Sequence, residues 1–191
     1  MSTAVVALHY QNDVIHPDGK IHAGVGDPAL IGNARRLLRG ARRAGVPVVS
    51  VGIVFRPGHR GGVTNSPMFE AAVRSRALVE GSWGAEFHEQ LKPRRGELVV
   101  RHSRINAFYG SDLELVLGSL GAQRLVVAGV ATHSTVEHTA RHAADIGYEV
   151  VVAADACAAA DPELHAAGLR ALALHVSRVA TVDEILGGWD G

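Results

Sequence analysis

The sequence has a single cysteine, no excess of either charge and no long apolar run. Cys157 alone cannot form an intramolecular disulfide, which suits a reducing compartment, so we expect a cytoplasmic protein. The 19 Lys and Arg residues balance the 19 Asp and Glu residues, which leaves no basic field for nucleic acid. No apolar stretch reaches the roughly 18 residues that span a bilayer, and no basic leader suggests a signal peptide. We therefore expect neither nucleic acid nor a membrane as a partner.

Short β-branched and apolar runs alternate with amphipathic helical stretches along the chain. Most of these runs are continuously apolar, as in parallel strands that helices cover on both faces. The pattern predicts one α/β domain over residues 1–191, with a doubly wound, mainly parallel six-stranded central sheet flanked by helices in Rossmann-like layers. The six predicted strands are residues 4–8, 46–54, 98–101, 125–128, 150–153 and 176–180.

Capping residues mark where the intervening helices begin. An acidic residue before a proline, or a Ser or Thr three residues before a Glu, satisfies the free N–H groups of a first helical turn. Four helix starts are predicted in this way, at Asp27, at Asp161, at Ser111 with Glu114, and at Thr181 with Glu184.

Polar residues at strand ends are the candidates for chemistry, because ligands of doubly wound sheets bind beyond the carboxyl ends of the strands. His9 follows the first predicted strand, His102 follows the third, and Thr135 lies near the start of the helix after the fourth. Residues 56–90 are too irregular for one helix and too long for a plain connection, so we expect them to line a site. Two imidazoles and one hydroxyl are thus predicted to converge.

Three blocks resemble the signature segments of the isochorismatase-like hydrolases: VVALHYQNDV, VVRHSRINAFYGSDLELVL and VVAGVATHSTVEHTARHAADIGYEVVVAADACA. Together they cover nearly the whole chain in the family's order. The resemblance implies the family's fold, a hydrolytic reaction in which an Asp and a Lys assist a Cys nucleophile, and a homodimer or homotetramer. In this sequence the Asp position is His9, the Lys position is His102 and the Cys position is Thr135.

These replacements leave several hypotheses open. A threonine hydroxyl needs a base, and a neutral histidine is a competent one near neutral pH. The first hypothesis is therefore an enzyme that acts on a small polar metabolite, by hydrolysis of a C–N or related bond or by acid–base chemistry, with His9, His102 and Thr135 as catalytic residues. The second is an inactive homologue that binds a small molecule or protein partner in the same crevice. Zinc held by His9, His102 and His133 is a third, but no compact ligand motif supports it, so we predict neither metal nor cofactor.

Further residues are predicted to bind the substrate. Gln11 is expected to orient the first-strand histidine, and Arg56 to bind a carboxylate through its planar fork. Backbone amides at Ser134 and Thr135 are candidates for an oxyanion site. Two potential imidazolium cations favour a negatively charged ligand. The substrate-binding candidates are Gln11, Arg56, Trp83, Phe108, Tyr109, His133 and Ser134, with core packing as the alternative for the aromatic residues. Cys157 is interpreted as a packing residue.

Overall fold

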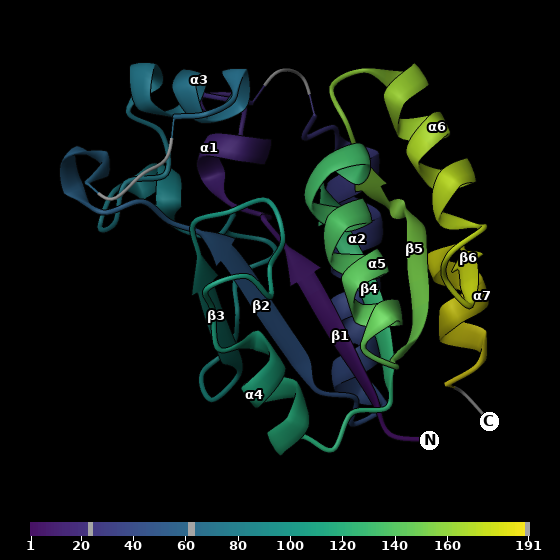
Figure 1. Cartoon of the computed structure of the whole chain (residues 1–191). Helices are drawn as coiled ribbons and strands as arrows, with labels where there is room; N and C mark the ends of the chain where they lie inside the picture. Colours follow the sequence, from purple (N-terminus) through teal and green to yellow (C-terminus); the bar gives the residue numbers. More distant parts are fainter. Residues whose placement is uncertain (23–24, 61–63, 190–191) are drawn as a thin grey trace.

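The computed structural model describes residues 1–22, 25–60 and 64–189. Its centre is a six-stranded sheet in the order β3-β2-β1-β4-β5-β6, and all strand pairs are parallel (Figure 1). Each predicted run falls on a strand, so the predicted α/β class is confirmed. The strands are β1 (Thr3–Leu8), β2 (Val48–Ile53), β3 (Leu98–His102), β4 (Arg124–Val130), β5 (Glu149–Ala158) and β6 (Arg178–Ala180).

Helices cover both faces of the sheet, with α5 in front of it and α2 behind it in Figure 1. Alternate residues of β1 enter two separate cores: Val5 and Ala7 pack with α2 and α7, whereas Val6 and Leu8 pack with α4 and α5. Among the described residues, no helix is long and apolar enough to cross a bilayer. The helices are α1 (Asn12–Ile15), α2 (Pro28–Arg43), α3 (Pro67–Ser75), α4 (Leu113–Ser119), α5 (Glu137–Asp145), α6 (Pro162–Leu172) and α7 (Val182–Gly187).

Three of the four predicted helix starts are confirmed by their capping hydrogen bonds, those at Asp27, at Asp161, and at Thr181 with Glu184. The capping box predicted at Ser111 is wrong. Helix α4 begins at Leu113, and the Ser111 hydroxyl accepts the Leu113 N–H at 3.1 Å rather than that of Glu114. The same hydroxyl donates to the Ala107 carbonyl at 2.6 Å, which holds Ser111 in the turn before the helix.

The strand order reverses between β1 and β4, and that is where the candidate residues gather. Chain connections leave these two neighbouring strands in opposite directions, which opens a crevice at their carboxyl ends. Residues 56–60 and 64–90 lie at this end of the sheet, where Figure 1 shows α1 and α3 above the strand tips. This segment contains α3 and two short 3-10 helices, η1 (Pro57–His59) and η2 (Trp83–Ala85).

Candidate active site

Two buried histidines face each other at the carboxyl end of the sheet. His9 comes directly after β1 in a left-handed conformation, with φ of 56°, and its backbone N–H donates to Val51. His102 is the last residue of β3 and is in register with Ile53, the last residue of the intervening β2. The Nε2 atoms of His9 and His102 are 2.6 Å apart, and each of these two residues is only 4% exposed. The structure therefore brings together the two imidazoles that the sequence predicted to converge.

Both imidazoles are neutral at neutral pH. Burial lowers the pKa of His102 from 6.5 to about 4. Burial, followed by repulsion from His102, also holds the pKa of His9 well below its usual value, and a backbone hydrogen bond to Val130 opposes this shift only in part. Neutral rings supply no positive field. The expectation of an anionic ligand, as far as it rested on two imidazolium cations, therefore loses its physical basis.

A single hydrogen lies between the two neutral Nε2 atoms, so one ring donates and the other accepts. Backbone groups interact with both rings in the same sense, Val130 with His9 and Asn106 with His102, so either ring can supply this hydrogen.

A cavity of about 370 Å³, here called the His9 cavity, lies beside His9. This volume falls in the usual range for small-molecule sites, about 300–1,000 Å³. His133, Ser134 and Thr135 line it together with His9, so four predicted site residues share one cavity. The remaining walls are almost entirely apolar and come from α1 and the chain after it, from residues 53–55 and 68–78, and from the segments after β3, β4 and β5: Val14, Ile21, Val25, Ile53, Phe55, Met68, Phe69, Ala71, Ala72, Leu78, Ile105, Val130, Ala131 and Ala160.

The turn after β4 carries Thr135, and a hydrogen bond connects this turn to α6. A cis peptide joins Val130 to Ala131, and a π-helical turn follows over Thr132–Val136. The Thr132 hydroxyl bonds to Nδ1 of His165 on α6 at 2.8 Å. Within the described part of the chain, the Thr135 hydroxyl forms no hydrogen bond with either imidazole. Ser134 N–H already donates to the Ala131 carbonyl at 3.1 Å, so it is not free for an oxyanion.

Gln11 does not line the His9 cavity, and its side chain instead positions the backbone nearby. Its fully buried amide donates to the carbonyls of Ile53, at 3.0 Å, and Ala85, at 2.8 Å, and it accepts the Ile53 N–H at 2.8 Å. These bonds tie the start of α1 to the end of β2 and to η2. The side chain predicted to orient His9 therefore fixes the backbone around the site.

The predicted aromatic residues do not line the His9 cavity. Phe108 is buried in the core on the opposite face of the sheet, with its ring 4.8 Å from that of His142. Trp83 packs edge-on against His16, and Tyr109 is 69% exposed. The aromatic walls are Phe55 and Phe69 instead. Local sequence did not separate these phenylalanines from Phe108, because the distinction depends on which face of the sheet each segment covers.

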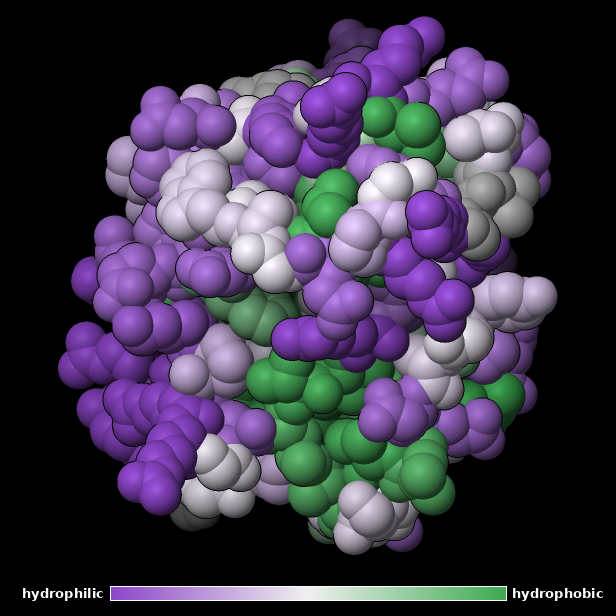
Figure 2. Space-filling model, turned by 90° about the vertical axis from the view of Figure 1, so that its left-hand side faces the viewer, coloured by the Kyte–Doolittle hydropathy of each residue, from purple (hydrophilic) through white to green (hydrophobic). Residues whose placement is uncertain are grey.

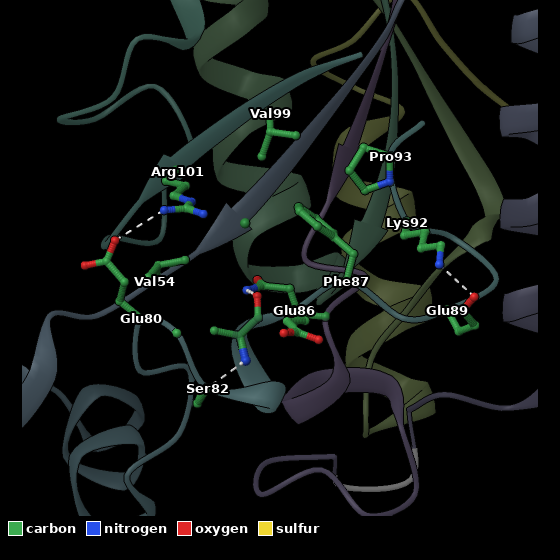
Figure 3. Close-up of a pocket in the computed structure, with 14 residues that line it drawn as sticks. Val54, Glu80, Ser82, Glu86, Phe87, Glu89, Lys92, Pro93, Val99 and Arg101 are labelled. Carbon is green, nitrogen blue, oxygen red and sulfur yellow. Dashed lines mark hydrogen bonds and ion pairs between the residues drawn. The ribbon is translucent and has the colours of Figure 1, made fainter. Parts of the chain in front are cut away.

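Arg56 lines a second cavity of about 440 Å³, here called the arginine cavity. His102, Arg60, Arg101 and Glu80 also line it, whereas His9 does not. A third cavity, of about 510 Å³, lies over β2 and β3 (Figure 3). Its walls include Phe87 and the Arg101–Glu80 ion pair drawn there, but neither histidine of the pair nor Thr135. The catalytic candidates therefore belong to the first two cavities.

Metal binding gains no support from the described residues, in which no three His, Cys, Asp or Glu side chains are placed to hold an ion. His133 is exposed on its turn and does not join the histidine pair. Burial raises the pKa of the Cys157 thiol to about 12, so this cysteine is a poor nucleophile and suits its predicted packing role.

Asp13 is an important site residue that the sequence analysis missed. It is 1% exposed, and its carboxylate accepts the backbone N–H groups of Leu78, at 2.7 Å, and Lys20, at 3.1 Å. These bonds join α1 to the segment that carries Leu78, so Asp13 holds two walls of the His9 cavity together. An acidic residue in the QND sequence directly after a buried strand was the available signal.

The fold and the position of the site together define the class of protein. An all-parallel sheet whose order reverses between β1 and β4, with polar side chains collected at that reversal, is a doubly wound α/β protein with its ligand crevice at the strand ends. The isochorismatase domain matches residues 3–184, and the chain belongs to the isochorismatase family.

Several relatives are similar along most of the chain. An isochorismatase family protein of Escherichia coli O157:H7, YecD, is 29% identical, and the match covers 97% of this chain and 95% of that protein. The ureidoacrylate amidohydrolase RutB of Caulobacter segnis is 30% identical, with 85% and 74% covered. Among solved structures, the N-carbamoylsarcosine amidase of Thermoplasma acidophilum is 27% identical with a TM-score of 0.75, and the match covers 96% and 98% of the two chains.

Proposed function

We propose that this protein is a hydrolase that cleaves a C–N or related bond of a small molecule bound in the His9 cavity. The observation that carries the proposal is a neutral, buried imidazole that shares one cavity wall with the Thr135 hydroxyl. The names of two relatives, an amidohydrolase and an amidase, describe hydrolysis of this bond type and support the reaction class. The mostly apolar walls favour a compact substrate with an apolar body. This revises the substrate class expected from the sequence, which was a small polar metabolite.

In the proposed reaction His9 is the general base. It takes a proton from the Thr135 hydroxyl, or from a water that this hydroxyl orients, as the oxygen attacks the substrate's carbonyl carbon. The protonated ring then delivers that proton to the departing nitrogen. Where Thr135 is the attacking group, this leaves an acyl ester, which a water hydrolyses as His9 takes the proton of the water and returns it to the Thr135 oxygen. In the free protein Nε2 of His9 is engaged by His102, so the ring must turn toward Thr135 when the substrate fills the cavity. Catalytic hydrogen bonds of this kind often form only in the substrate complex.

A noncatalytic binding protein is the second candidate, and the same hydrogen bond favours it. The imidazoles satisfy each other rather than Thr135, as expected of side chains that fill a vacated site. Such a protein would still bind a small apolar molecule in the His9 cavity, but no substitution at His9 or Thr135 would alter a turnover rate.

The test is a turnover assay with a panel of carboxamides and ureido and carbamoyl compounds. The variants are His9→Asn and Thr135→Val, and the matched control is His138→Gln, which changes an exposed histidine on the neighbouring α5. We expect kcat/KM to fall at least about 100-fold in His9→Asn, the usual contribution of a general base, and to stay unchanged in the control. Rates that are equal in wild type and His9→Asn would overturn the proposed role of His9, whereas ligand binding without turnover would favour the second candidate.

A further inference from the structure

The arginine cavity carries a surplus of positive charge that the hydrolase proposal does not use. Three guanidinium groups line it, those of Arg56, Arg60 and Arg101, against the single carboxylate of Glu80. Glu80 pairs with Arg101 at 3.2 Å, as Figure 3 shows. Within the described residues, neither Arg56 nor Arg60 forms an ion pair. The guanidinium groups of Arg56 and Arg60 therefore remain available to bind a ligand.

The arginine cavity and the His9 cavity have opposite chemical character. The two cavities adjoin at the histidine pair, since His102 lines the first and His9 lines the second, and Phe55 lines both. The His9 cavity has apolar walls and the arginine cavity has charged ones. Figure 2, which faces the left-hand side of Figure 1, shows hydrophilic side chains along the left and upper part of this surface and a hydrophobic patch in its lower middle.

A second observation places a polar group beside these arginines. His102 lines the arginine cavity as well and is only 4% exposed, so a molecule bound there lies beside a buried imidazole whose signal reports its presence.

We propose that the arginine cavity binds a small dicarboxylate anion through Arg56 and Arg60, at a site separate from the His9 cavity. A guanidinium group matches a carboxylate with two parallel N–H donors, and two unpaired arginines can hold one carboxylate each. The cavity volume of about 440 Å³ suits a small molecule. The RPGHRGG segment lacks the glycine and lysine spacing of a phosphate-binding loop, which favours a carboxylate over a nucleotide phosphate. This proposal extends beyond hydrolysis and does not depend on it.

Succinate is the probe, titrated into the free protein at constant ionic strength while the ring signals of the histidines are followed by NMR. We expect a saturable shift of the His102 signal, because the anion lies beside that ring. In the Arg56→Gln/Arg60→Gln variant the affinity should fall at least 10-fold. The matched control is Arg39→Gln/Arg43→Gln, which removes two exposed arginines of α2 and should leave the affinity unchanged.

Three results would overturn the proposal. A shift that rises linearly without saturation would show that no site exists. Equal weakening in both double variants would show that succinate responds only to overall charge. Tighter binding of inorganic phosphate than of succinate would replace the carboxylate by a phosphate ligand. Because no substrate is present in the titration, each outcome is independent of whether the His9 cavity supports turnover.

Discussion

Acidification from pH 7 to pH 4 is expected to destabilise the folded protein, because buried His102 resists protonation. Burial lowers its pKa in the folded protein from 6.5 to about 4, whereas in the unfolded chain the ring keeps its ordinary value. Between these two pH values the unfolded chain binds more protons, so stability is lost as the pH falls through this window. Above it the contribution is fully present. The gap corresponds to about 3 kcal/mol, a large part of the roughly 5–15 kcal/mol that stabilises most domains.

The measurement is urea denaturation at pH 7, 6, 5 and 4, with the free energy of unfolding compared between wild type and His102→Gln. The variant lacks the His102 imidazole, whose pKa burial lowers, and it also removes the repulsion between His102 and His9. Its free energy of unfolding should therefore fall by about 3 kcal/mol less than that of wild type over this pH range. His138→Gln, at an exposed position, should follow wild type. Parallel pH profiles for wild type and His102→Gln would refute the conclusion that burial keeps the pair neutral.

Three further predictions concern the surrounding structure. Gly84→Ala places a Cβ against the Asp13 carboxylate and should destabilise the protein by about 1–3 kcal/mol in thermal unfolding, whereas Gly32→Ala, in open space on α2, should stabilise it by about 1 kcal/mol. Cys157, with a thiol pKa of about 12, should not react with an aromatic disulfide reagent at pH 8 until urea unfolds the chain; rapid reaction of the folded protein would contradict its burial. Thr181→Ala removes the capping box of α7 and should cost about 1 kcal/mol in the same unfolding assay.

The sheet was predictable because its signal is local. Each buried strand is a continuous apolar run, as in residues 4–8. The helical spacing of apolar residues and the capping residues together mark where helices such as α2 begin. The exceptions are equally physical. Strand β5 continues to Ala158, beyond the predicted end at residue 153, because a register shift opposite Gly129 of β4 lets pairing resume at Cys157. Ser111 failed as a cap because the Ala107 carbonyl binds its hydroxyl in the preceding turn.

The site was predictable only as a set of strand-end residues. The rule that ligands bind at carboxyl strand ends brings His9, His102 and Thr135 to one edge, and the structure places all three there. It does not say that the imidazoles bond to each other, that both are neutral, or that Arg56 faces a different cavity. Those properties depend on burial and on neighbours far along the chain, which one sequence does not specify.

The histidine pair also has a consequence for folding kinetics. His9 and His102 are 93 residues apart in the sequence, and β3, as an edge strand, pairs only with β2. Long-range contacts of this kind form late, since the entropy of closing a long loop is lost before the contact stabilises anything. The bond between the rings is complete only when β3 has joined the sheet. In a refolding experiment, the His9 ring signal should therefore change when β3 pairs with β2. That change should be independent of when the core around β1 and β4 forms.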